Sequence, residues 1–404
     1  MMVDTIEVKT GGVTTPAGFR AAGISAGIKA NKGLDLALLV SDTSATASAV
    51  FTVNRAPAAP VLVSKQHLEL SGGIARAVIV NSGCANACTG AEGLQVARDM
   101  TAETARIVGC PVEQVLVAST GVIGVALPME KIRGGLPAAA AALAADQGPA
   151  AARAIMTTDP FPKEAAATVD IGGRTVTIGG MAKGSGMIEP MMATMLGFVT
   201  TDARVPRALL DRALRDAVND TFNAITVDGE CSTNDCVMLL ANGAGGASVD
   251  DTNYDAFVHA LTTVCLTLAL GIVRGGEGAT KLVTVIVTGA ASDADARRAA
   301  KAIANSLLVK TAIHGGDPNW GRLIAVAGRA GVEFELSRAA VTIGSTVLFK
   351  DGRPYDEAAP QAAAYLKGKD ISVSVDLGAG QTSSTVWTCD LSAEYVRINA
   401  DYRT

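Results

Sequence analysis

Short apolar runs alternate with longer amphipathic stretches along the whole chain, which predicts a mixed α/β protein. Buried strands are expected at 74–80 and 115–119, and a further strand at 195–201. Segment 169–178 predicts a hairpin, because two β-branched arms flank a Gly-Gly pair, and 339–349 resembles a second hairpin. Helices are expected at about 92–108, 129–156, 205–219, 253–272, 292–309 and 356–367.

Composition narrows the class of protein. A chain of 404 residues with 49% hydrophobic and 18% charged residues can bury a large core, and two large lobes or domains are expected. The net charge of -5 and the lack of a basic stripe argue against nucleic-acid binding. The most apolar stretch, 261–273, is shorter than the roughly 20 residues of a membrane span, which favours a buried helix and no membrane partner. The start of the chain does not resemble a secretory signal, so a cytoplasmic location is expected.

Cysteine usage fits a reducing compartment. Seven cysteines, an odd number, suggest free thiols rather than a disulfide framework. The close pairs are Cys84 with Cys88 and Cys231 with Cys236, and no histidine is near either pair in the sequence. No metal site is therefore expected.

Segment 179–198, GGMAKGSGMIEPMMATMLGF, is the most unusual part of the sequence. Its glycines make a helix costly and Pro190 would break a central strand, so it cannot be one regular element. The break between this irregular loop and the following strand falls at Ala193-Thr194.

That break can support self-cleavage followed by acyl transfer. A threonine hydroxyl needs a base, and the α-amine of an N-terminal threonine can serve, with a reference pKa of about 7.7 to 8.0. An internal Thr194 reaches this state if its hydroxyl attacks the carbonyl of Ala193 in an N-to-O acyl shift and water then releases the upstream chain.

The sequence gives little support for a nucleophile that is activated by histidine. The three histidines are His67, His259 and His314, and none lies in a GxSxG elbow. The preferred interpretation of His314 is a loop histidine hydrogen-bonded to the backbone. Segment 119–124, after an apolar strand, could supply an oxyanion hole, and the alternative is an ordinary strand-to-loop turn.

At this point the residues resemble a known family. Lys183-Gly184-Ser185-Gly186-Met187-Ile188, followed by Pro190 and Met192-Ala193-Thr194-Met195-Leu196, resembles the self-cleavage motif of the ornithine acetyltransferases, also called bifunctional glutamate N-acetyltransferases. Further motifs that match the family are 81–83 with 85–87, 119–121, 157–159, 226–229, 232–235, 316–322 and 399–402.

The resemblance implies a role for each matching residue. Thr194 would be the nucleophile and the first residue of a β chain, 194–404, released from an α chain, 1–193, by cleavage after Ala193. Thr120 and Gly121 would stabilise the oxyanion. The residues implied to contact substrate are Thr157, Lys183, Thr194, Glu277, Asn399 and Thr404.

The local sequence leaves other interpretations open. Without the resemblance, the local sequence favours a solvated loop lysine at Lys183. Glu277 lies in a Gly-rich run that superficially resembles a phosphate-binding loop, but the run lacks the Gly-Lys-Ser/Thr ending. Asn399 and Thr404 are close to the end of the chain, where disorder is the usual expectation, whereas the resemblance predicts an ordered tail.

The implied reaction transfers acetyl from N-acetylornithine to glutamate through an acetyl-threonine, in arginine biosynthesis, with no metal or organic cofactor. Acetyl-CoA as a second donor is left open. The implied fold is α/β, with layered sheets and helices arranged as in N-terminal-nucleophile hydrolases but with distinct connectivity. The two products would interleave in one catalytic unit and assemble as a heterotetramer of two α and two β chains. Alternatives are a self-processed N-terminal-threonine amidohydrolase or aminopeptidase, and a non-catalytic amino-acid-binding protein.

Overall fold

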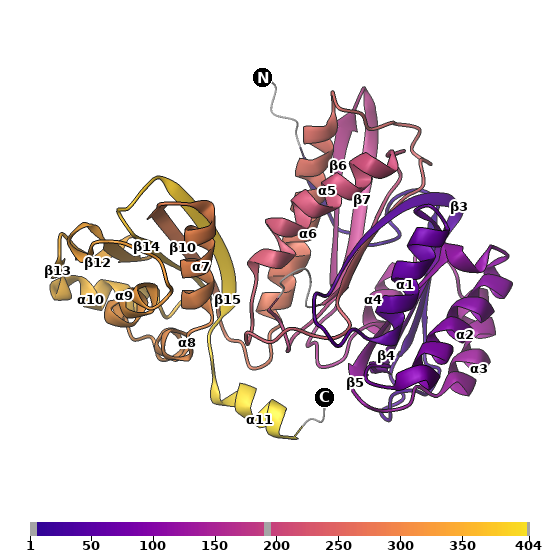
Figure 1. The fold of residues 1–404 in the computed structure, drawn as a ribbon, viewed down its shortest axis with the longest axis horizontal. Helices are drawn as coiled ribbons and strands as arrows, with labels where there is room; N and C mark the ends of the chain where they lie inside the picture. The colour runs from indigo at the N-terminus through magenta and orange to yellow at the C-terminus, as the bar shows by residue number, and fades with distance from the viewer. Residues whose placement is uncertain (1–5, 190–194, 402–404) are drawn as a thin grey trace.

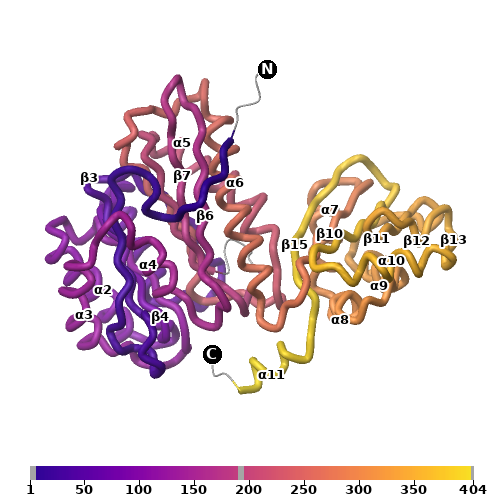
Figure 2. Tube along the Cα trace, turned by 180° about the vertical axis from the view of Figure 1, so that it is seen from behind, coloured from indigo at the N-terminus to yellow at the C-terminus, as the bar shows by residue number. Residues whose placement is uncertain are grey.

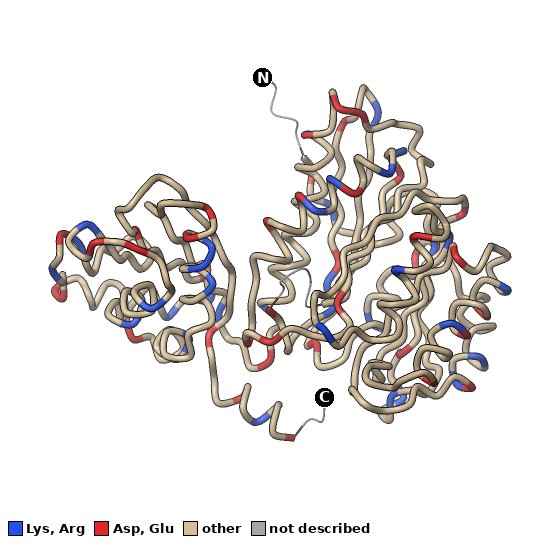
Figure 3. Tube along the Cα trace, viewed as in Figure 1, with Lys and Arg blue, Asp and Glu red and all other residues tan. Residues whose placement is uncertain are grey.

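The computed structural model describes residues 6–189 and 195–401, which form two lobes and a C-terminal arm (Figure 1). Each lobe is built on its own β-sheet, and the predicted α/β class is confirmed. Figure 3 shows acidic and basic residues interspersed along both lobes.

The first lobe contains a nine-stranded sheet in the order β1-β6-β7-β8-β9-β3-β4-β5, with β2 paired to β3. Strand β3 is 16 residues long, and its first half pairs with β2 and β4 while its second half pairs with β9. It therefore belongs to both halves of the sheet. The strands are β1 (Glu7–Lys9), β2 (Phe19–Ile24), β3 (Leu36–Phe51), β4 (Ile74–Cys84), β5 (Val115–Val122), β6 (Lys163–Ile171), β7 (Arg174–Lys183), β8 (Leu196–Thr201) and β9 (Cys236–Ala241).

Side chains along these strands point alternately to the two faces of the sheet, and apolar residues on both faces produce a lobe of four layers. In β9, Met238 faces a core between the two halves of the sheet and Leu239 faces a core under α5 (Arg207–Asn219) and α6 (Tyr254–Arg274). On the far side, β4 and β5 pack against helices α1 (Ala59–Leu70), α2 (Gly90–Val108) and α3 (Met129–Ala141). Helix α4 (Gly148–Ala154) joins the inner core. The order is helix, sheet, sheet, helix, which is the layered arrangement that the family resemblance implies.

The second lobe contains a six-stranded sheet in the order β13-β12-β11-β14-β10-β15. Its helices share one core with the sheet. The strands are β10 (Leu282–Ala290), β11 (Ala340–Ile343), β12 (Thr346–Lys350), β13 (Arg353–Pro354), β14 (Asp370–Asp376) and β15 (Thr382–Cys389). The helices are α7 (Asp293–Ala304), α8 (Leu307–Gly315), α9 (Trp320–Gly328) and α10 (Ala359–Tyr365). Short 3-10 helices occur at Val112–Gln114, Phe222–Ala224, Leu336–Arg338 and Asp356–Ala358.

After β15 the chain leaves the second lobe and forms α11 (Ala393–Asp401), which reaches back toward the first lobe. Figure 2 shows the same arm from behind, again beneath the gap between the two lobes. The tail is therefore helical through residue 401, and Thr404 lies outside the described residues.

Two predicted helices are each two helices in the structure. The stretch 129–156 is divided into α3, which ends at Ala141, and α4, which begins at Gly148 with Pro149 in its first turn, where proline is well tolerated. The stretch 292–309 ends at Ala304, and Ser306 begins α8 by accepting a hydrogen bond from the backbone of Val309.

Helix α6 is longer than its most apolar stretch suggests. Its 21 residues are long and apolar enough, by length and composition, to cross a membrane. One side of the helix packs against β6, β7 and α5, and burying that side completes the outer core of the first lobe. The prediction of a buried helix is confirmed.

Candidate functional site

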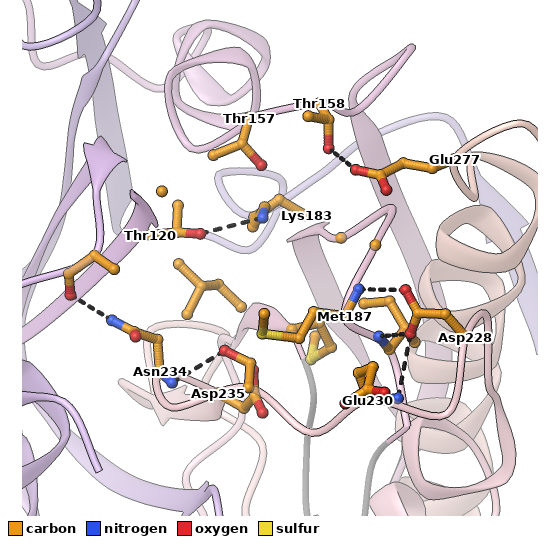
Figure 4. A pocket seen from close by; sticks show the side chains of 18 of the residues that line it. Thr120, Thr157, Thr158, Lys183, Met187, Asp228, Glu230, Asn234, Asp235 and Glu277 are labelled. Atoms are coloured by element: carbon orange, nitrogen blue, oxygen red, sulfur yellow. Dashed lines mark hydrogen bonds between the residues drawn. The ribbon is translucent and has the colours of Figure 1, made fainter. Parts of the chain in front are cut away.

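A cavity of about 140 Å³ lies in the first lobe where β5 and β7 end and β8 and β9 begin (Figure 4). Residues from α11 and from the loop before β9 complete its wall. The predicted site residues that line it are Thr120, Gly121, Thr157, Lys183, Glu277 and Asn399.

Thr120 and Gly121 form a tight corner at the end of β5. Gly121 has φ +127°, and a Cβ there would lie 2.4 Å from the carbonyl carbon of Gly83 on the neighbouring β4. Only glycine fits this approach. The side-chain amide of Asn234 holds the corner by donating to the carbonyl oxygens of Ser119, at 2.9 Å, and Ala85, at 2.6 Å.

Lys183, at the end of β7, is buried rather than solvated, so its interpretation as a solvated loop lysine is wrong. Its ammonium donates to the hydroxyl of Thr120 across 3.2 Å. The carboxylate of Asp159 lies nearby and accepts from the ammonium of Lys163 and from the backbone N–H of Gly184. Burial alone would raise the pKa of Asp159. The ammonium groups of Lys183 and Lys163 outweigh burial and lower the pKa to about 2.

Glu277 lies on the opposite wall and is 7% exposed. One oxygen accepts from the hydroxyl of Thr158 at 2.7 Å, and the other accepts from the amide of Asn399 at 2.8 Å. The backbone N–H of Glu277 donates to the carbonyl of Ser185 at 2.8 Å. The carboxylate therefore joins the C-terminal arm to Thr158, and the backbone of Glu277 joins both to Ser185. Thr158 is a site residue to which the sequence analysis gave no role.

Asp228 holds the turn that follows β7. Its carboxylate accepts from the backbone N–H groups of Met187 and Ile188 at 2.7 and 2.8 Å, and from the hydroxyl of Tyr395 at 3.3 Å. Met187 has φ +57°, an uncommon conformation for a residue with a side chain. Beyond the turn, the carboxylate of Glu189 lies 3.3 Å from the ammonium of Lys301 in the second lobe.

The predicted scissile bond, Ala193-Thr194, lies outside the described residues, but both flanks are defined. Upstream, Ile188 lines the cavity and its carbonyl accepts from the backbone N–H of Val227 at 2.8 Å. Downstream, Met195 also lines the cavity and its carbonyl accepts from the backbone N–H of Cys236 at 3.0 Å. The chain thus enters and leaves 190–194 at the cavity wall.

The polar groups of the cavity suit a small zwitterion. Lys183 supplies a cation, and Asp228, Glu230 and Glu277 supply carboxylates. An α-amino acid carries both charges, so both of its ends can find a partner. Among residues 6–189 and 195–401, no group of three His, Cys, Asp or Glu side chains is placed to hold a metal ion.

His314 does not line the cavity, and its predicted environment is wrong in two respects. It lies in the last turn of α8 rather than in a loop, and its Nδ1 is hydrogen-bonded to the carboxylate of Asp390 at 2.7 Å rather than to backbone. Asp390 also accepts from the backbone and hydroxyl of Thr280. This cluster joins α8 to the end of β15.

Comparison with known proteins agrees with the family resemblance that the sequence motifs indicate. The model of the ArgJ family matches residues 20–404. The arginine biosynthesis bifunctional protein ArgJ of Symbiobacterium thermophilum is 51% identical over 406 residues, covering 99% of this chain and 100% of that protein. Its counterpart in a Synechococcus species is 50% identical over 407 residues, covering 98% of each. A crystal structure of ornithine acetyltransferase complexed with ornithine, from Mycobacterium tuberculosis, is 43% identical and covers 47% of this chain and 100% of that chain, with a TM-score of 0.44. The chain belongs to the ArgJ family.

Proposed function

We propose that the chain transfers an acetyl group from N-acetyl-L-ornithine to L-glutamate, with Thr194 as the nucleophile. The observation that carries this proposal is the convergence of Thr120, Lys183, Glu277 and Asn399 on the cavity at which both flanks of 190–194 end. Membership of the ArgJ family makes the chain an acyltransferase of arginine biosynthesis, and the amidohydrolase alternative is not favoured.

The first half of the reaction forms an acetyl-enzyme. The freed α-amine of Thr194 takes the proton of its own hydroxyl, and Oγ attacks the acetamide carbonyl of N-acetylornithine. The corner at Thr120 and Gly121 stabilises the oxyanion, and the hydrogen bond from Lys183 polarises the Thr120 hydroxyl as it does so. The tetrahedral intermediate collapses, and ornithine leaves with a proton from the α-ammonium.

The second half transfers the acetyl group to glutamate. The amine of glutamate attacks the acetyl ester while the α-amine of Thr194 takes its proton, and the release of N-acetylglutamate restores the hydroxyl. Thr157, Lys183, Glu277, Asn399 and Thr404 bind the two amino acids in turn. The cavity must exclude water, because hydrolysis of the ester would waste the acetyl group.

Formation of the nucleophile requires cleavage after Ala193. We expect an α chain of residues 1–193 and a β chain of residues 194–404. Strands β7 and β8, which precede and follow the cut, pair in one sheet, so the two products would stay together. We further propose assembly as a heterotetramer of two α and two β chains in the cytoplasm, where the seven free cysteines would remain reduced.

Relatives carry the name bifunctional, and we propose acetyl-CoA as the second acetyl donor. Incubation with acetyl-CoA and glutamate tests this directly. N-acetylglutamate should form without N-acetylornithine, and its absence would restrict the enzyme to the transfer between amino acids.

Incubation with N-acetylornithine, with and without glutamate, tests the main proposal. Ornithine release should depend on glutamate after the first turnover. Equal release without glutamate would indicate an amidohydrolase instead. A single uncut species at 40.9 kDa on a denaturing gel would favour the non-catalytic binding protein.

A further inference from the structure

Thr158 lies on the cavity wall beside Glu277, and the proposed reaction does not use it. Its hydroxyl contacts two side chains at once, the carboxylate of Glu277 at 2.7 Å and the hydroxyl of Ser185 at 2.6 Å. Figure 4 shows the hydroxyl of Thr158 directed at the carboxylate. Ser185 belongs to the Lys-Gly-Ser-Gly part of the family motif and is 1% exposed. The proposed reaction gives this buried hydroxyl no role either.

The directions of these two hydrogen bonds follow from the chemistry of the groups. An ionised carboxylate can only accept, so the single proton of the Thr158 hydroxyl is donated to Glu277. The oxygen of Thr158 is then the acceptor in the contact with Ser185, and Ser185 is the donor. The two hydroxyls therefore form one chain that ends on the carboxylate of Glu277 and fixes its orientation.

The oxygens of Glu277 have partners, but its charge has none. One oxygen accepts from Thr158 and the other from the amide of Asn399, and both donors are neutral. Among residues 6–189 and 195–401, Glu277 forms no ion pair with a lysine, arginine or histidine. A carboxylate that is 7% exposed destabilises the fold unless a cation compensates it. Because Glu277 lines the cavity, a bound substrate can supply that cation.

The proposed acetyl donor has one group that meets this need. The α-nitrogen of N-acetylornithine is an amide, so the side-chain ammonium is the only cation of the molecule. Its α-carboxylate suits Lys183, the cation of the same cavity. Glutamate has no side-chain cation, and its amine must be neutral when it attacks the acetyl ester. The cation that Glu277 requires therefore comes from the donor and not from the acceptor.

We propose, on the basis of the proposed function, that Thr158 is a positioning residue that determines specificity for the acetyl donor. The hydroxyl chain from Ser185 through Thr158 holds the carboxylate of Glu277 toward the side-chain ammonium of N-acetylornithine. Thr158 acts through Glu277 and needs no contact with the substrate. Removal of its hydroxyl leaves one oxygen of Glu277 and the hydroxyl of Ser185 without their partner, so the carboxylate is no longer held.

The test replaces Thr158 with valine, which has nearly the same shape but no hydroxyl. In a ping-pong reaction, kcat/KM for N-acetylornithine reports the first half and kcat/KM for glutamate reports the second. Thr158→Val should lower kcat/KM for N-acetylornithine by about 10-fold, as expected for the loss of one hydrogen bond to a charged group. The value for glutamate should change by less than about 3-fold. Thr158→Ser restores the hydroxyl and should recover most of the loss.

The matched control is Thr263→Val. Thr263 is a half-buried threonine of α6 whose hydroxyl donates to the carbonyl of His259 on the same helix. This substitution removes the same group away from the cavity, so both kcat/KM values should stay at the wild-type level.

N-acetylnorvaline separates positioning from a structural role of Thr158. This compound keeps the acetyl group, the α-carboxylate and the carbon chain of N-acetylornithine but lacks the ammonium. Wild type and Thr158→Val should use it equally, because it presents no charge for Glu277 to bind. An equal loss with both donors, an equal loss for glutamate, or wild-type kinetics in Thr158→Val would overturn the proposal.

The proposed function fails by a different result, which is a wild type that releases no ornithine from N-acetylornithine in the presence of glutamate. Calorimetric binding of ornithine and norvaline then still tests the contact, because it needs no turnover. Thr158→Val should bind ornithine about 10-fold more weakly than wild type and bind norvaline equally well. Equal affinities of the two proteins for ornithine would overturn the role of Thr158.

Discussion

The ammonium of Lys183 donates a hydrogen bond to the hydroxyl of Thr120 across 3.2 Å, and both side chains are buried in the wall of one cavity. This contact joins the strand that leads into the predicted cleavage segment to the corner where the oxyanion would be held. The same cation can therefore align the corner and attract the carboxylate of an amino-acid substrate.

Replacing Lys183 with methionine tests this contact. Loss of one charged hydrogen bond of about 1.5 to 3 kcal/mol should lower kcat/KM for ornithine release by about 10- to 100-fold. Steady-state kinetics on fully cut protein measure the effect. The matched control is Lys350→Met, an exposed lysine of the second lobe, which should leave kcat/KM unchanged. Equal kinetics for both variants would show that Lys183 does not act at the site.

Alanine at position 121 should damage the corner more than alanine at position 124. Both glycines have positive φ, but a Cβ at 121 would strike the backbone of β4, whereas a Cβ at 124 meets open space. Gly124→Ala should cost about 1 kcal/mol from its backbone conformation. Gly121→Ala adds a steric clash and should cost several times more. Urea unfolding gives both values, and equal losses would contradict the close approach.

The buried pair of Asp159 with Lys163 should make stability depend on acid pH. The pKa of Asp159 is lowered to about 2, below its value in the unfolded chain, so its stabilisation is present above about pH 4 and is lost as pH falls toward 2. The contribution at neutral pH is roughly 2 kcal/mol. Urea titrations between pH 7 and pH 3, with the chain kept whole by Thr194→Ala, measure it. Asp159→Asn should be less stable at pH 7 and show a smaller loss between pH 4 and pH 3; an unchanged slope would refute the assignment.

The C-terminal arm should contribute to substrate affinity. Asn399→Ala removes a hydrogen bond to Glu277 and should raise KM by about 5- to 10-fold, as expected for roughly 1 kcal/mol of binding, with a smaller change in kcat. Val396→Ala is the control, because Val396 is on the same helix but 65% exposed. If both variants kept the wild-type KM, α11 would have no part in binding.

Local patterns predicted the elements whose signals are contained within a few residues. The hairpin at Gly172-Gly173 is present as β6 and β7, and the strands after residues 74 and 115 are present as β4 and β5. Helix α1 was missed because two polar residues face the core. Ser64 and His67 hydrogen-bond to the carbonyl oxygens of Val117 and Val115 on β5, which hides the apolar periodicity.

The sequence predicted only those site residues that lie in motifs of the resembling family. Thr120 and Lys183 could be named from the resemblance, but their contact spans 63 positions in the chain and depends on the sheet. Asp228 lies in a motif that the sequence contains without a stated role. Its role depends on which backbone N–H groups the fold brings to it, and no local pattern encodes that.

Mass spectrometry of purified protein incubated with N-acetylornithine in the absence of glutamate tests the central claim most directly. The account predicts two chains, the second beginning at Thr194 and carrying one acetyl group on that residue. It also predicts that Thr194→Ala yields one intact, unacetylated chain. An intact wild-type chain, or an acetyl group on any residue other than Thr194, would contradict the account.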